Sequence, residues 1–111
     1  MTTLYNLSKI AGDSESIVVT VVDETGAAVD LTGSTIEYAI KTDVRALANL
    51  LLLTSATTAI TILSNTFTIT MTPSNTVSLA GEYYHEAEIT TADARVFTPF
   101  IGKIVIHTSG V

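Results

Sequence analysis

A segment of strictly alternating residues constrains the fold more than any other feature of the chain. Between Thr66 and Thr72, Phe67, Ile69 and Met71 share one parity and four threonines share the other. Successive side chains of a β-strand point to opposite faces of a sheet, whereas a helix would scatter these residues around its axis. The segment is therefore predicted to be a strand with one face in a core and the other toward water.

Four further runs also predict strands. The alternation recurs in 36–40 and 60–62, whereas 16–22 and 96–106 are apolar at both parities. For 16–22, we therefore expect a central strand that is covered on both faces. Short turn sequences with Asp and Gly separate the runs, which favours antiparallel hairpins. With 111 residues and 47% hydrophobic content, the chain is predicted to form one all-β, immunoglobulin-like antiparallel β-sandwich of seven or eight strands.

A leucine-rich segment fits two structures. Val44, Leu47 and Leu51 recur at helical spacing behind Asp43, a residue type that caps helices. This spacing predicts a short crossover helix over 43–51. The alternative is a loop that feeds an edge strand over 50–54, and the sequence leaves both open.

The segment Leu79-Ala80-Gly81-Glu82-Tyr83 has the form of a tyrosine corner. In such a corner, a tyrosine near the start of the penultimate strand returns its hydroxyl to backbone a few residues upstream. We therefore assign structural roles to Leu79, Gly81 and Tyr83. In the strand that follows, His85 falls on the same parity as Tyr83, and we expect its imidazole to be partly buried and hydrogen-bonded.

The chain offers little for catalysis, cofactors or metals. Only His85 and His107 could serve a nucleophile, and no nucleophile-elbow glycine pattern surrounds any serine. Cysteine is absent, the six glycines are dispersed, and Glu82, Glu86 and Glu88 fit a solvated strand face better than a catalytic pair. We expect a protein that is not an enzyme and that has no catalytic residues, no cofactor and no metal site.

Charge and hydropathy limit the classes of partner. The net charge is −6 and the five basic residues are scattered, so nucleic acid is not an expected partner. The longest apolar run, 50–53, is far shorter than the roughly 20 residues of a membrane helix. The mean hydropathy of +0.47 instead indicates apolar surface that contacts other proteins.

Two segments are the candidates for that contact. We divide the chain into residues 1–10, an N-terminal arm, and residues 11–111, the sandwich domain. In a second interpretation, the first ten residues are simply the first strand of the sandwich. The predicted interface residues lie in the arm and in the leucine-rich segment: Leu4, Tyr5, Leu7, Ile10, Leu47, Leu50, Leu51 and Leu53.

Several of these motifs occur in an order that resembles a known group of proteins. Gly12-Asp13-Ser14, the hairpin from Val22 to Ile36, Leu79-x-Gly81-x-Tyr83 and the strand from Asp93 to Gly102 are similar to small immunoglobulin-like structural proteins of tailed bacteriophage virions. That family includes domains like the N-terminal domain of baseplate upper proteins and capsid decoration proteins.

The resemblance implies a non-enzymatic structural or accessory virion protein that acts through protein–protein adhesion. Its partners would be other virion proteins of the capsid, tail or baseplate, and the chain would be multicopy or homo-oligomeric. It would fold in the host cytoplasm and end in the virion. The competing hypothesis is a carbohydrate- or receptor-binding immunoglobulin-like module, because such sandwiches present binding loops at their ends.

Overall fold

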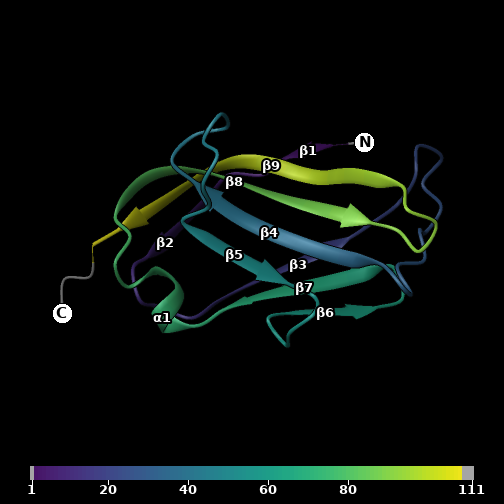
Figure 1. Ribbon diagram of the computed structural model, residues 1–111, viewed down its shortest axis with the longest axis horizontal. Coiled ribbons are helices and arrows are strands. Elements are labelled where there is room, and N and C mark those ends of the chain that lie inside the picture. The colour runs from purple at the N-terminus through teal and green to yellow at the C-terminus, as the bar shows by residue number, and fades with distance from the viewer. Residues whose placement is uncertain (1, 109–111) are drawn as a thin grey trace.

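A computed structural model describes residues 2–108, which form nine strands and one short helix in two facing sheets (Figure 1). The elements in chain order are β1 (Thr3–Leu4), β2 (Leu7–Ile10), β3 (Glu15–Thr20), β4 (Thr35–Lys41), β5 (Leu51–Thr54), β6 (Ile60–Leu63), β7 (Thr66–Met71), α1 (Pro73–Thr76), β8 (Gly81–Thr90) and β9 (Val96–His107). The predicted all-β class is confirmed.

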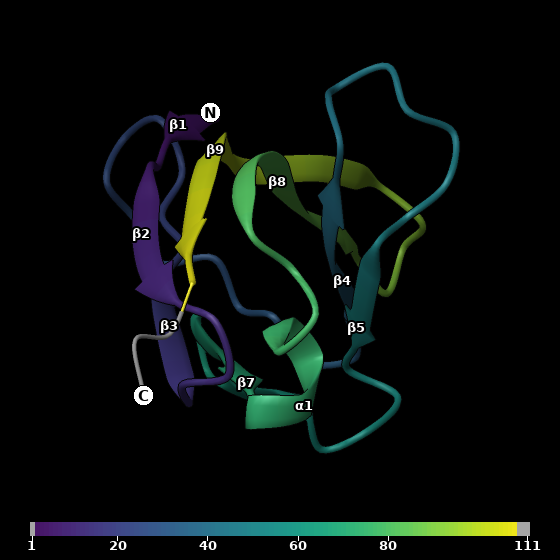
Figure 2. The ribbon, with the colours of Figure 1, turned by 90° about the vertical axis from the view of Figure 1, so that its left-hand side faces the viewer.

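One sheet has six strands in the order β1-β9-β8-β4-β5, with β2 also paired to β9, and the other has the order β3-β7-β6. Figure 2 shows the strands surrounding one interior, with α1 at the near end. With strands lettered as in immunoglobulin domains, β3, β7 and β6 take the places of B, E and D, and β9, β8, β4 and β5 those of G, F, C and C′. The predicted sandwich is therefore correct.

The prediction of purely antiparallel sheets is wrong in one place. Strands β1 and β2 run parallel to β9, with Thr3 opposite Phe100 and Leu7 opposite Ile104. No tight turn connects these strands to β9, so no hairpin fixes their direction. Residues 3–10 therefore behave as a first strand in two pieces, which is the second of the two interpretations of the N-terminal segment.

The core lies between the two sheets and follows the predicted parity. Phe67, Ile69 and Met71 of β7 are fully buried, and so are the β4 residues Ile36, Tyr38 and Ile40. Along β8, Ala87 and Ile89 are buried while the alternate residues are exposed or half-buried. These three strands thus place their apolar parity inside, as period-two patterning requires.

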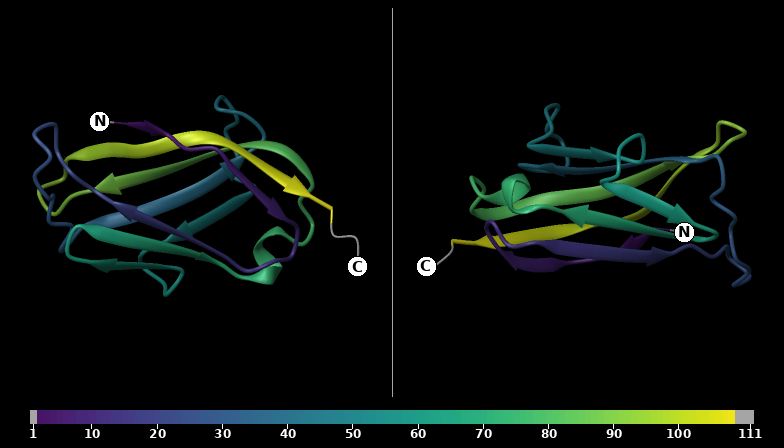
Figure 3. Two further views of the ribbon diagram at one scale, coloured as in Figure 1. Left: turned by 180° about the vertical axis from the view of Figure 1, so that it is seen from behind. Right: turned by 90° about the horizontal axis from the view of Figure 1, so that it is seen from below.

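Strand β3 corrects the expectation of a central strand over 16–22. It lies at the edge of the three-stranded sheet and pairs only with β7. Ile17 faces the core, whereas Val18 is 64% exposed. The reason is the course of the N-terminal strand, which pairs with β9 and leaves the outer side of β3 without a neighbour (Figure 3).

Of the two structures that the sequence left open here, the helix over 43–51 is wrong and the loop with an edge strand over 50–54 is confirmed. Residues 42–50 form a loop, and β5 follows as an edge strand paired with β4. Asp43 bonds the backbone N–H of Arg45 in a local turn, and the Leu50 N–H donates to the Ile40 carbonyl at 2.7 Å. The hairpin forms because it packs Leu51 and Leu53 against the core. A short helix at this place would have no apolar surface of the protein to pack against.

Candidate adhesion surfaces

The tyrosine corner has the expected geometry and a structural role. The Tyr83 hydroxyl donates to the Ala80 carbonyl at 2.8 Å and accepts from the Ala80 N–H at 3.1 Å. Gly81 adopts a φ of 121°, a conformation that favours glycine, and Leu79 packs against the core. The three residues fix the entry of the chain into β8.

His85 is fully buried, more deeply than the sequence suggested. Its Nε2 lies 2.7 Å from the Tyr5 carbonyl oxygen and its Nδ1 lies 2.8 Å from the Tyr38 hydroxyl. A carbonyl only accepts, so Nε2 carries the proton and Nδ1 accepts from Tyr38. Burial lowers the pKa of His85 and raises that of Tyr38. The imidazole is thus a neutral structural link between the core and the N-terminal strand.

Gly102 makes that link possible. It lies opposite His85 in the β8–β9 ladder, and a Cβ at this position would overlap the Tyr5 carbonyl oxygen and lie 2.6 Å from its carbon. The missing side chain lets the Tyr5 carbonyl enter the sheet and reach the imidazole. Asn6 completes the crossing, since its Oδ1 accepts the Lys103 N–H at 2.9 Å.

A second buried polar cluster was not expected from the sequence, where Lys9 counted only as one of several scattered basic residues. Its side chain is buried, and its ammonium donates to Thr76 Oγ1 and the Asp13 carbonyl at 2.8 Å each and to the Ile10 carbonyl at 3.1 Å. Burial lowers the pKa of Lys9. The cluster connects α1 to the turn between β2 and β3. The only feature of the sequence that pointed to this cluster was a lysine in the same short strand as Leu7 and Ile10.

The eight predicted interface residues divide into two groups. Four are half-buried and pack against the core, which makes them structural: Tyr5, Leu7, Leu51 and Leu53. The other four are exposed and remain candidates for contact with a partner: Leu4, Ile10, Leu47 and Leu50.

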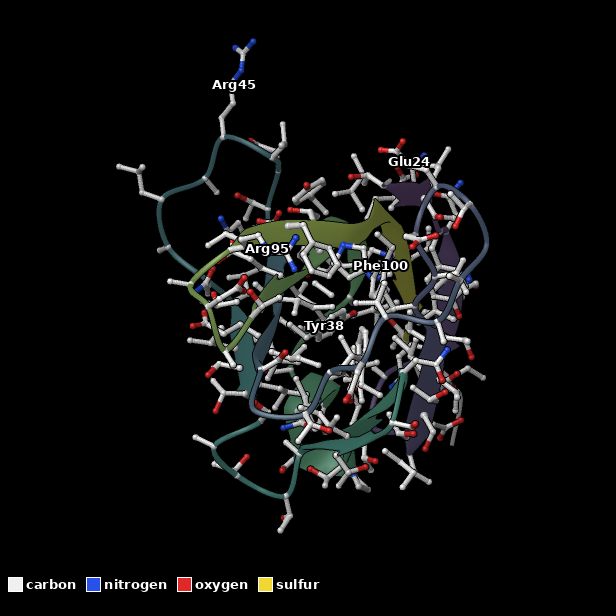
Figure 4. All side chains as sticks on the ribbon, turned by 90° about the vertical axis from the view of Figure 1, so that its right-hand side faces the viewer. Glu24, Tyr38, Arg45, Arg95 and Phe100 are labelled. Carbon is white, nitrogen blue, oxygen red and sulfur yellow. The ribbon has the colours of Figure 1, made fainter. Side chains whose placement is uncertain are left out.

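The loop over residues 42–50, here called the apolar loop, carries the most exposed aliphatic side chain of the described residues. Leu47 is 102% exposed, Val44 is 62% exposed and Leu50 is 44% exposed. Arg45 projects outward from the same loop (Figure 4). Three exposed aliphatic side chains within seven residues make this loop a candidate for contact with a partner.

A groove of about 720 Å³, here called the end groove, opens between β3 and the first residues of β9. Its apolar lining comes mainly from β3 with its continuation and from β9: Ile17, Val19, Val21, Val29, Phe97 and Phe100. The groove exists because the sandwich has no strand beyond the outer side of β3.

Charged residues border the end groove at the same end of the sandwich: Asp23, Glu24 and Arg95. The Thr25 hydroxyl and two backbone N–H groups lower the pKa of Asp23. Arg95 forms an ion pair with Asp93 at 3.2 Å, so the border keeps an excess of negative charge.

Two glutamates of β8 form ion pairs with lysines, and His107 is hydrogen-bonded at the surface. Glu82 forms an ion pair with Lys103 at 3.2 Å, and Glu86 forms one with Lys41 at 3.6 Å. His107 is exposed and bonds the Ser8 hydroxyl at 2.9 Å. Among residues 2–108, no group of three or more His, Cys, Asp or Glu side chains is arranged to hold a metal ion. None of the helices described there has the length and hydropathy to cross a membrane.

Neither a protein-family model nor a curated protein sequence matches this chain.

Proposed function

We propose that this chain is a non-enzymatic structural or accessory protein that acts by adhesion to other proteins, within the virion of a tailed bacteriophage. Two features support adhesion: the apolar loop with Leu47 entirely in solvent, and the apolar end groove. The bacteriophage setting rests on the order of the turn and corner motifs in the sequence. Leu47 is the main support for adhesion, because an aliphatic side chain that is exposed to water does not stabilise the isolated domain.

The buried polar groups are consistent with this function. His85 and Lys9 both have their hydrogen-bonding groups engaged with neighbouring parts of the fold. Titratable groups at these positions stabilise the sandwich and are out of reach of a substrate. Such a framework holds two exposed surfaces in fixed positions, which is what an assembly component requires.

Co-sedimentation with phage particles tests the proposal. Particles produced from the genome that encodes this chain are banded in a density gradient, and the chain is quantified in the particle band by mass spectrometry. We expect a constant copy number per particle for the unaltered chain and a reduced number for Leu47→Asp. Leu63→Asp is the matched control, since Leu63 is 80% exposed and lies outside the apolar loop, in β6. Absence of the unaltered chain from the particles would overturn the proposal.

A carbohydrate- or receptor-binding module is the second candidate, favoured by the position of the end groove. The loops 21–34 and 91–95 that border it correspond to the B–C and F–G loops, which carry recognition in antibody variable domains. A glycan array probed with the purified chain and with Val96→Glu tests this candidate. Binding that Val96→Glu abolishes would support it, and absence of binding to any glycan would remove the carbohydrate form of the hypothesis.

A further inference from the structure

The apolar loop and the end groove are chemically complementary surfaces of one molecule. The loop presents Val44, Leu47 and Leu50 as a convex aliphatic group, and the groove is a concave site with aliphatic and aromatic walls. Burying a leucine and a valine side chain gains about 1.5–3 kcal/mol each. The volume of about 720 Å³ lies in the range of sites that enclose small ligands, so several side chains can enter it.

The charges at the two surfaces also match. Arg45 projects from the apolar loop, whereas the Asp43 carboxylate beside it is turned back onto the Arg45 backbone N–H at 2.8 Å. The border of the groove holds Asp23 and Glu24, and the positive charge of Arg95 is paired with Asp93. Asp23 Oδ1 accepts hydrogen bonds from the Thr25 hydroxyl and from the backbone N–H groups of Thr25 and Ala27. Among residues 2–108, however, neither Asp23 nor Glu24 has an ion-pair partner, so an arginine entering beside the groove can form one. This complementarity selects one orientation of the loop.

The two surfaces cannot meet within one molecule. The apolar loop leaves the end of β4, whereas the groove is bordered by the start of β9 and the loop before β4, at the other end of these strands (Figure 1). Contact between different surfaces of identical molecules is heterologous, so a docked pair keeps one free groove on one copy and one free loop on the other. Such contacts extend into filaments, or into a ring if the rotation closes.

We propose that the apolar loop of one copy docks in the end groove of a second copy, with Leu47 in the groove and Arg45 against Asp23 and Glu24, so that the chain assembles head to tail. This inference rests on the proposed adhesive function and gives it a particular form. It assigns the occupant of the groove to this chain, in preference to a glycan or a foreign peptide.

Mixing two assembly-deficient variants tests the proposal. Leu47→Asp removes the docking side chain and keeps the groove, whereas Val96→Glu adds a charge at the groove and keeps the loop. Val96 lines the groove and is 59% exposed, so the fold tolerates the change. Sedimentation velocity and light scattering then give the mass of each protein and of their mixture, and circular dichroism verifies folding. Leu63→Asp and Val77→Glu are controls at exposed sites outside the groove and the loop.

Head-to-tail docking predicts a distinct set of masses. The unaltered chain gains mass steadily with concentration, each variant alone is a monomer, and both controls behave like the unaltered chain. The equimolar mixture forms a dimer and nothing larger, because it holds one working loop and one working groove. An unaltered chain that stays monomeric up to about 1 mM, or a mixture that stays monomeric, overturns the proposal.

A charge exchange gives an independent measurement. Arg45→Glu and Glu24→Arg each weaken the association by about two- to fivefold, the range of an exposed ion pair, and the double variant recovers it. No recovery in the double variant would refute the assigned orientation. These results are separate from the particle experiment: monomers that still enter particles would reject the docking alone, and assemblies absent from particles would reject the virion role alone.

Discussion

The buried His85 makes the stability of the fold sensitive to mildly acidic pH. In the native state the neutral imidazole accepts from Tyr38 and donates to the Tyr5 carbonyl. A protonated imidazole could still donate to the Tyr38 oxygen, but the Tyr38 O–H would then lose its acceptor inside the core. Lowering the pH below the ordinary histidine pKa of 6.5 is therefore expected to destabilise the protein.

The sign and size of the effect follow from proton linkage. Because burial lowers the pKa of His85 in the folded state, the unfolded state binds more protons below pH 6.5. Stability is thus fully present above pH 6.5 and is lost as the pH falls, by up to about 1.4 kcal/mol for each pH unit while the native imidazole stays neutral. Between pH 6.5 and pH 5 the loss is therefore at most about 2 kcal/mol, the limit for an imidazole that stays neutral throughout. Native Asp23, Asp30 and Asp93 have pKa values lowered from 3.8, so the stability that they contribute is present at pH 5 and above and is lost only as the pH falls below 3.8.

Urea unfolding between pH 7.5 and pH 5 measures this loss. His107→Gln should retain the pH dependence, because His107 is exposed, whereas His85→Gln should flatten it. An NMR titration of the native protein gives a second measurement that needs no variant. The chemical shifts of the His85 imidazole should stay constant as the pH falls below 6.5. A native His85 that titrates with an ordinary pKa, or an unaltered chain equally stable at pH 7 and pH 5, would refute the reasoning.

Three further substitutions test the contacts that hold the elements together. Gly102→Ala should lower the free energy of unfolding by about 3 kcal/mol or more, since the new Cβ displaces the N-terminal strand. Amide hydrogen exchange should become faster only in residues 3–10, and unchanged protection there would contradict the role assigned to Gly102. Thr76→Val should lower the free energy of unfolding in urea by about 1–3 kcal/mol, because the Lys9 ammonium loses a buried acceptor. An equally stable variant would show that the hydrogen bond between Lys9 and Thr76 does not stabilise the fold. Tyr83→Phe should cost about 1 kcal/mol by the same assay through loss of the bond to Ala80, and no change would contradict a stabilising corner.

Residues 43–54 show where local pattern reaches its limit. A run of four leucines, 50–53, satisfies a helical and an extended period equally, so the sequence left open both a helix over 43–51 and a loop with an edge strand over 50–54. In the folded protein, β4 offers an open edge and a core beneath it, and Leu51 and Leu53 pack there. Tertiary packing overrides the weak helical preference of a short segment.

The candidate surfaces were predictable only in part. Their apolar character followed from the composition, and Leu47 and Leu50 were identified in advance. The end groove was not, because it depends on β3 having no outer neighbour, and the sequence 16–22 would suit a central strand equally well. An edge is a property of the sheet, and a strand carries no unambiguous sign of how many neighbours it has.

By itself, the sequence determined the strands with clear alternation and the tyrosine corner. These features depend on residues within a few positions of one another, where the period of side-chain directions and the geometry of turns are decisive. Only the tertiary structure decided that His85 meets a carbonyl 80 residues away, that Gly102 admits it, and that Lys9 reaches Thr76 across 67 residues. Such contacts arise when sheets pair and pack, and that pairing depends on the free energy of the whole core rather than on any local segment.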